Sequence, residues 1–117
     1  MLTAIHPKLP MRNIADTRNY YQAQLGFTIV GDYGNYLIME RDGLQIHFFE
    51  FRELDPKTND GQLYIRTNDI DQLFHSLLEN NTPIHPNGSL ADKPWGQREF
   101  SLLDPDHNLL TFGQATH

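Results

Sequence analysis

The chain has 117 residues, of which 38% are hydrophobic and 21% are charged, and these values fit one compact globular domain rather than a disordered segment. Its formal net charge of −6 argues against nucleic acid as a partner, because phosphate backbones attract basic surfaces. The absence of cysteine excludes disulfides, a thiol nucleophile and a thiolate metal site. No apolar stretch approaches membrane-spanning length and the N-terminus lacks the features of a signal peptide, so we expect a cytoplasmic protein.

The first half of the chain predicts the element order β-α-β-β-β. Prolines confine the opening apolar segment, residues 4–11, to a sheet edge or an arm. A helix follows, begun by Asn13 or Asp16 and ended at Gly26. Strands are then expected at residues 27–30, 35–40 and 44–51. Asp42-Gly43 joins the last two and is the strongest hairpin signal in the sequence.

The second half repeats this order after a turn-rich linker. A strand is expected at residues 62–67, and Asp69 then begins a helix that Asn80-Asn81 end. A loop-rich stretch with one short strand at most precedes strands at 98–103 and 109–112. Residues 9–12 align with 63–66, and residues 46–48 align with 110–112. We therefore divide a single domain, 1–117, into a module at about 4–51, a linker at about 52–61 and a second module at about 62–115.

We predict an α+β fold in which the two tandem βαβββ modules form a curved mixed sheet. One face of each module is covered by its helix, and the two uncovered faces together would form a trough of the kind in which ligands bind. Strand alternation places Gln45, His47, Phe49 and Phe51 on the trough side of one strand. It places Gln62, Tyr64 and Arg66 on the trough side of another. By this interpretation four strands bring together His6, His47, Gln62 and Thr111.

Three stretches resemble the vicinal-oxygen-chelate superfamily of glyoxalases, bleomycin resistance proteins and dioxygenases, and bleomycin resistance proteins are the most similar members. The first is His6-Pro7-Lys8-Leu9-Pro10-Met11-Arg12, with its spacing to Tyr20-Tyr21 and Leu25-Gly26-Phe27. The second is Phe48-Phe49 followed by Leu54-Asp55-Pro56. The third and most specific is Pro94-Trp95-Gly96-Gln97-Arg98-Glu99-Phe100, running to Asp104-Pro105-Asp106 and Asn108. Together these stretches extend over nearly the whole chain.

The resemblance implies a homodimer that exchanges its N-terminal arm and holds ligands in clefts at the subunit interface. It implies antibiotic resistance by sequestration of a bulky cationic drug of the bleomycin type, without chemical change and without a cofactor. Such a site needs aromatic plates and acidic groups. The predicted ligand-binding residues are Trp95, Phe49, Phe51, Tyr64, His47, Glu50, Arg98 and Phe100, and Glu53, Asp55 and Glu99 are further candidate acids.

Two alternatives stay open. Metal-dependent lyases, isomerases and dioxygenases of the superfamily hold a divalent metal at four strand positions that correspond here to His6, His47, Gln62 and Thr111. The first three are candidate ligands for weakly bound Zn²⁺ or Ni²⁺, but Thr111 stands where relatives usually have Glu, which weakens the case for a catalytic metal. A module that binds an unrelated small ligand is the other alternative. Some of the predicted ligand-binding residues also have a purely structural interpretation. Trp95 would then be a core or interface residue, and Arg98-Glu99 would be a cross-strand ion pair.

Overall fold

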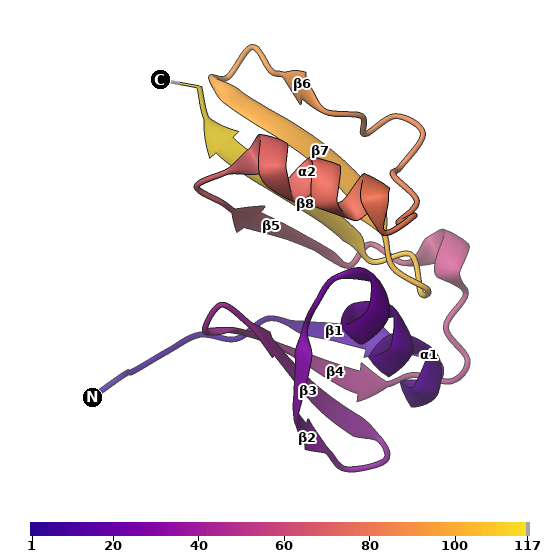
Figure 1. Cartoon of the computed structure of the whole chain (residues 1–117). Helices are drawn as coiled ribbons and strands as arrows, with labels where there is room; N and C mark the ends of the chain where they lie inside the picture. Colours follow the sequence, from indigo (N-terminus) through magenta and orange to yellow (C-terminus); the bar gives the residue numbers. More distant parts are fainter. Residues whose placement is uncertain (117) are drawn as a thin grey trace.

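The computed structural model, which describes residues 1–116, contains two βαβββ modules in tandem (Figure 1). The first module consists of β1 (Lys8–Met11), α1 (Ile14–Asn19) with its π-helical continuation (Tyr20–Gln24), β2 (Thr28–Asp32), β3 (Tyr36–Arg41) and β4 (Leu44–Glu50). A short 3-10 helix (Pro56–Thr58) lies in the connection. The second module consists of β5 (Gln62–Arg66), α2 (Ile70–Glu79), β6 (Ala91–Asp92), β7 (Gln97–Leu103) and β8 (Leu109–Ala115). The predicted fold class is confirmed.

Local side-chain chemistry explains where these elements begin and end. The Asn13 side chain accepts hydrogen bonds from the backbone N–H groups of Ala15 and Asp16, and Asp69 caps α2 in the same way. Asp42 and Gly43 both have positive φ, at 52° and 78°, which is the conformation that a tight hairpin turn requires. The predicted cap at Asn13 and the predicted hairpin are therefore confirmed.

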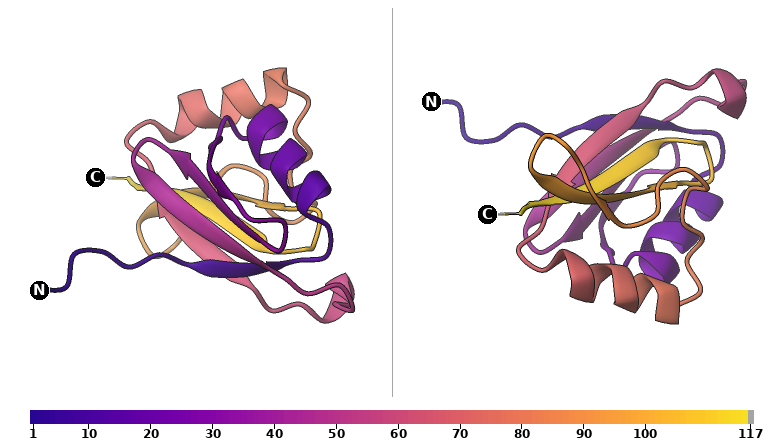
Figure 2. Two further views of the ribbon diagram at one scale, coloured as in Figure 1. Left: turned by 90° about the horizontal axis from the view of Figure 1, so that it is seen from below. Right: turned by 90° about the horizontal axis from the view of Figure 1, so that it is seen from above.

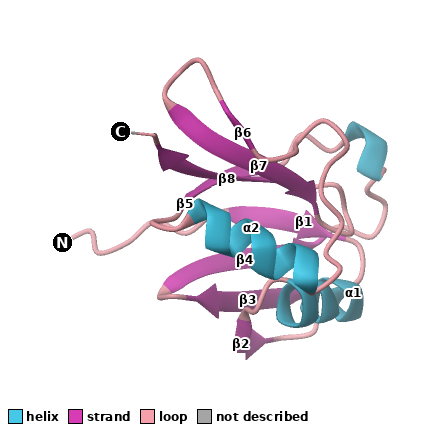
Figure 3. Ribbon diagram, turned by 45° about the horizontal axis from the view of Figure 1, so that its top comes forward, coloured by secondary structure: helices cyan, strands magenta, loops and turns pink. Residues whose placement is uncertain are grey.

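The strands form two four-stranded sheets rather than one continuous sheet (Figure 3). Sheet A has the order β1-β4-β3-β2 and sheet B the order β5-β8-β7-β6, with β1 parallel to β4 and β5 parallel to β8. Lys8 pairs with His47, and Tyr64 pairs with Thr111. The alignment of residues 9–12 with 63–66 is therefore wrong by two positions, since Lys8, not Pro10, corresponds to Tyr64. Because strand alternation has a period of two, this shift leaves each side chain on its predicted face.

Both helices lie on the same side of the two sheets, whose facing edges are β1 and β5 (Figures 1 and 2). One apolar core joins the helix-facing side chains of both modules, including Tyr21, Phe48, Leu77 and Phe100. The opposite face of each sheet has no helix over it, and we call it the uncovered face. Among the described residues, no helix is long and apolar enough to cross a membrane.

A buried polar network joins the modules at the turn between β7 and β8. Asp104 accepts hydrogen bonds from the Tyr21 hydroxyl (2.7 Å), from Asn108 Nδ2 (2.8 Å) and from two backbone N–H groups of the turn. Burial raises the pKa of the Asp104 carboxyl, although these hydrogen bonds oppose the shift. Burial next to Asp104 likewise raises the pKa of Tyr21. The network joins the π-helical continuation of α1 to the β7–β8 turn of the second module, and so helps to orient the two sheets.

Candidate functional site

Strand register identifies the side chains on each uncovered face. In β4 of sheet A, Ile46 and Phe48 are buried toward the helices, so the residues that alternate with them point to the uncovered face. In β8 of sheet B, Leu110 and Phe112 are buried in the same way, and their neighbours along the strand point to the uncovered face. The uncovered face of sheet A carries Lys8, Pro10, Tyr36, Ile38, Glu40, Gln45, His47 and Phe49. The uncovered face of sheet B carries Gln62, Tyr64, Arg66, Gln97, Glu99, Ser101, Leu103, Leu109, Thr111 and Gly113.

Glu99 is the centre of an aromatic cluster on sheet B. Its Oε2 atom accepts hydrogen bonds from the Tyr64 hydroxyl (2.7 Å) and from the Trp95 indole Nε1 (3.0 Å). Glu99 is only 7% exposed, whereas Trp95 is 65% and Tyr64 46% exposed. Partial desolvation and the bond to Glu99 raise the pKa of Tyr64. The cluster therefore combines a buried acid with two accessible aromatic rings.

A tight turn brings Trp95 to this cluster. Gly96 has a φ of +80°, and its N–H donates to the carbonyl of Lys93, while the N–H of Lys93 donates to Gln97. The turn leads directly into β7, which carries Glu99. The exposure of Trp95 rules out its interpretation as a core residue of this chain.

Histidine and aromatic side chains dominate the uncovered face of sheet A. The rings of His6 and His47 stack with centroids 5.0 Å apart, and a 2.8 Å hydrogen bond joins Tyr36 Oη to His47 Nδ1. His47 Nε2 is buried and has no hydrogen-bond partner. Partial burial, followed by the nearby positive charges of His6 and Lys8, lowers the pKa of His47. The His47 imidazole is therefore held in its neutral form at neutral pH.

The four predicted metal positions do not form a ligand set within one chain. His6 and His47 come together, but Gln62 and Thr111 lie on the other sheet. The Thr111 hydroxyl bonds to that of Ser101 at 2.9 Å. In residues 1–116, no group of three or more His, Cys, Asp or Glu side chains is placed to hold a metal ion. These residues of a single chain do not fit the metal centre of the superfamily's enzymes.

Two of the predicted ligand-binding residues face the helix side instead. Phe100 is 1% exposed and stacks on Phe112 in the core beneath α2. Arg98 points the same way and pairs with Asp71 of α2 (2.9 Å) and Asp92 of β6 (3.0 Å). The expected Arg98–Glu99 ion pair is thus wrong, because adjacent residues of a strand point to opposite faces.

The other predicted residues of the first half of the chain lie at the C-terminal end of β4 or just beyond it. Phe49 and Glu50 line a hollow of about 730 Å³ together with Tyr36, Lys8, Asn35, Arg52 and Glu53. Glu50 forms an ion pair with Arg52. Phe51 follows the end of β4 and is exposed. Asp55 is also outside the sheet, where its side chain caps the short 3-10 helix.

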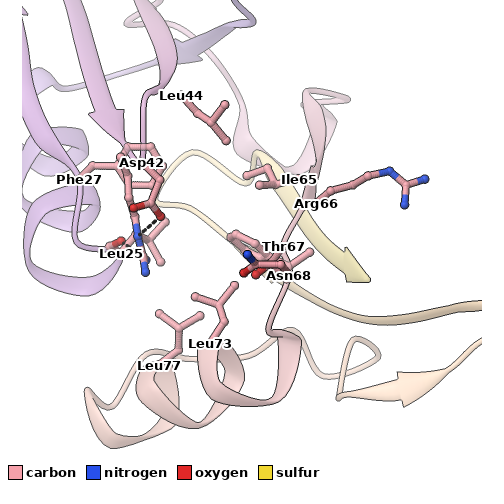
Figure 4. Close-up of a pocket in the computed structure, with 12 residues that line it drawn as sticks. Leu25, Phe27, Asp42, Leu44, Ile65, Arg66, Thr67, Asn68, Leu73 and Leu77 are labelled. Atoms are coloured by element: carbon pink, nitrogen blue, oxygen red, sulfur yellow. Dashed lines mark hydrogen bonds and ion pairs between the residues drawn. The ribbon is translucent and has the colours of Figure 1, made fainter. Parts of the chain in front are cut away.

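A second hollow, on the helix side, was not predicted. This cavity of about 570 Å³ lies between the modules and is lined mainly by apolar side chains, among them Phe27, Leu44, Ile65 and Leu77 (Figure 4). The Arg66 guanidinium points away from it and donates to Gln97 Oε1 on the uncovered face (3.1 Å). The cavity is therefore separated by β5 from the Glu99 cluster.

Sequence reasoning named Glu99 only among several candidate acids and missed Gly113, Gln97 and Tyr36. Alternation alone could have found Glu99, because Phe100 and Leu102 must face the core and so assign Glu99 and Ser101 to the opposite face. No local signal marks Gly113, whose importance depends on a side chain of another strand.

Comparison with known proteins shows what the chain is similar to. A family model described as a glyoxalase-like domain matches residues 5–116. The bleomycin resistance protein of Geobacillus stearothermophilus is 29% identical, over 97% of this chain and 97% of the relative.

Two solved structures are similar to this one over almost their full lengths. One is a bleomycin-binding protein complexed with bleomycin, with a TM-score of 0.85 and 27% identity over 97% of this chain and 98% of that one. The other is a bleomycin resistance determinant encoded on a transposon, with a TM-score of 0.88 and 26% identity over 99% of this chain and 100% of that one. The likeness therefore includes both modules and both uncovered faces.

Proposed function

Because the chain belongs to the family of glyoxalase-like domains, we propose that it binds a cationic antibiotic of the bleomycin type and sequesters it without changing it chemically. The observation that carries this proposal is the Glu99 cluster, where a buried carboxylate holds two exposed aromatic rings. Such rings stack on flat heterocycles, and an acid nearby attracts a cation. The relatives named as bleomycin resistance and bleomycin-binding proteins support the choice of ligand.

We further propose that two copies of the chain form the binding cleft. The exposed area is 7242 Å², whereas a compact monomer of 13.6 kDa exposes roughly 6,600 Å². The radius of gyration is 14.4 Å, against about 13.4 Å for a compact chain of this length. Leu2 and Ile5 of the N-terminal arm are 98% and 96% exposed, and apolar side chains of this kind support an arm that packs on a second copy. The uncovered face of sheet A on one copy would then oppose that of sheet B on the other.

In this arrangement sequestration depends on binding alone. Trp95 and Tyr64 supply stacking surface, Phe49 and Tyr36 supply an opposing aromatic wall, and Glu99 supplies negative charge. The relatives' names describe resistance and binding, which supports a role without catalysis. A cytoplasmic location remains a prediction.

Trp95 is the only tryptophan of the chain, so its fluorescence tests the proposal directly. We expect bleomycin to quench it saturably at about one ligand per chain, as two clefts per dimer require. Light scattering after size exclusion should give twice the chain mass of 13.6 kDa. A flat titration at high micromolar bleomycin would refute the ligand, and a stable monomer would refute the shared cleft.

Metal analysis tests the enzyme alternative. Stoichiometric Zn²⁺, Ni²⁺, Mn²⁺ or Fe²⁺ in the purified protein, lost in His47→Ala, would favour a metal-dependent enzyme over sequestration.

A further inference from the structure

We propose that Glu99 forms a subsite for an organic cation bearing N–H groups, a primary ammonium or a guanidinium, which binds the Oε1 atom of its carboxylate beside the exposed ring of Trp95. The inference rests on the proposed function and deepens it, since it names the part of the ligand that sheet B binds. It also assigns a positioning role to Gly113, which lets Tyr64 reach Glu99.

The first observation is that Glu99 is buried without a cationic partner. Among residues 1–116, no Lys, Arg or His side chain forms an ion pair with it. Both of its hydrogen bonds go to Oε2, so Oε1 accepts none from the described part of the chain. Oε1 is open to solvent, so an N–H group of a ligand cation can reach it and form the ion pair that the chain does not supply.

The two other buried acids, Asp104 and Asp106, differ from Glu99 in this respect, and so does Glu50 of β4. Both carboxylate oxygens of Asp104 are saturated by hydrogen bonds within the turn and with Tyr21. Glu50 is paired with Arg52, and Asp106 with Arg12. Among the buried acids, Glu99 is therefore the one whose surroundings leave room for an external donor.

The second observation is the orientation of the two rings. Trp95 and Tyr64 direct their polar edges at Glu99 Oε2, which fixes the rings while leaving ring surface exposed. Tyr64 already has the Arg66 guanidinium 5.5 Å from its ring centroid, but Arg66 is held by Gln97 rather than by Glu99. A ligand cation can therefore contact the Trp95 ring and Glu99 Oε1 together, and aromatic faces stabilise such cations.

The third observation explains how Tyr64 reaches Glu99 across the intervening strand. Gly113 of β8 lies opposite Glu99 of β7 and opposite Arg66 of β5. A Cβ atom on Gly113 would lie 2.6 Å from Tyr64 Cζ and closer still to its hydroxyl oxygen. Any side chain at position 113 would thus displace the tyrosine ring from the acid, so the glycine leaves the gap through which the cluster assembles.

The Trp95 indole N–H signal in a proton–nitrogen correlation spectrum gives a direct readout, because this N–H donates to Glu99. The probes are agmatine and butylammonium, two cations that carry N–H groups. Tetramethylammonium is the control cation without N–H groups, and 1-butanol is the uncharged control. The full chain is titrated as wild type, as Glu99→Gln and as the matched control Glu79→Gln, whose side chain is exposed at the end of α2 on the helix side.

We expect saturable shifts of the indole signal with agmatine and butylammonium in the wild type and in Glu79→Gln. Glu99→Gln should weaken both by about 10- to 100-fold, the usual contribution of a hydrogen bond to a charged group. Equal affinity in Glu99→Gln, an equal response to tetramethylammonium, or no wild-type shift at tens of millimolar probe would overturn the proposal.

Two glycine variants, Gly113→Ala and its control Gly31→Ala, provide a second test if Glu99→Gln does not fold. Gly113→Ala should displace Tyr64 and weaken agmatine binding severalfold, while an unfolding curve shows that the chain is folded. Gly31→Ala is its control, because that Cβ would meet only the exposed Tyr33 ring, at 2.8 Å, on sheet A. Unchanged agmatine affinity in a folded Gly113→Ala would refute the positioning role.

The outcomes for the subsite and for the proposed function are distinguishable. Agmatine binding without bleomycin binding would reject the antibiotic and keep the cation subsite. Bleomycin binding that is unaffected by Glu99→Gln would keep the function and reject the subsite.

Discussion

The two sheets have the same strand order and matching registers, yet their uncovered faces carry different side chains, most clearly in one row of three corresponding positions. Sheet A has Pro10, Phe49 and Tyr36 side by side across β1, β4 and β3, and sheet B has Arg66, Gly113 and Glu99 across β5, β8 and β7. A large ring on the central strand fills this part of sheet A. In sheet B the central position is empty, and Tyr64 crosses it to reach an acid.

The comparison teaches that a repeated backbone supplies two similar surfaces but not two similar sites. A single small residue on the central strand decides whether aromatic side chains can gather around a buried carboxylate. Lys8 on the uncovered face of sheet A carries the charge opposite to that of Glu99 on the uncovered face of sheet B. Complementary charge of this kind suits faces that oppose each other across a cleft.

The largest expected effect concerns the contact that holds the two sheets in their relative orientation. Asp104→Asn should lower the free energy of unfolding by about 2–3 kcal/mol, because an amide cannot accept all the hydrogen bonds that the buried carboxylate accepts. Chemical denaturation measures the loss. Asp55→Asn is the control, since Asp55 caps an exposed turn and should cost less than about 1 kcal/mol. Equal losses in the two variants would show that the network does not join the modules.

The next effect distinguishes the two faces as ligand walls. Trp95→Ala should weaken bleomycin binding by about tenfold or more, because it removes the most exposed ring next to Glu99. Phe49→Ala on sheet A should weaken it by about threefold, since this ring is partly buried against its own sheet. Calorimetric titration measures both, with Tyr33→Ala as an exposed aromatic control. A larger loss in Phe49→Ala would reverse the assignment of sheet B as the main binding face.

A smaller effect concerns pH. The folded-state pKa of Asp104 is raised above its ordinary value of 3.8, so the folded chain retains this proton more strongly than the unfolded chain does. The stability that follows is fully present below pH 3.8 and is lost as the pH rises through the folded pKa. The stability difference between wild type and Asp104→Asn should therefore decrease from pH 4 to pH 7, as unfolding curves would show. An increase over this range would mean that burial does not raise the pKa of Asp104.

The smallest effect concerns Arg98, which was predicted to bind ligand. Its ion pairs with Asp71 and Asp92 lie at the surface of the helix side. Arg98→Ala should lower the free energy of unfolding by less than about 1 kcal/mol and leave bleomycin affinity unchanged. A clear loss of affinity would place Arg98 in the cleft after all, contrary to the face on which it lies.

Local patterns predicted most of the elements correctly. The caps at Asn13 and Asp69, the Gly26 helix end and the Asp42-Gly43 turn depend on hydrogen bonds and dihedral angles within a few residues. Strand ends were less accurate, because pairing with a neighbour decides how far a strand continues. The last strand, for example, extends to Ala115 instead of ending at Phe112.

The sequence by itself determined the two βαβββ modules and the side chains that alternate toward each face. The reason is that apolar residues repeat every 3.6 positions in a helix and every two positions in a strand, which is visible in the sequence alone. Only the tertiary structure decided the strand register within the modules, the meeting of Tyr64 and Trp95 at Glu99, and the gap at Gly113 that Tyr64 occupies. These features depend on which strands lie next to each other. Residues 64, 99 and 113 are far apart along the chain, so only the folded arrangement of β5, β7 and β8 brings them together.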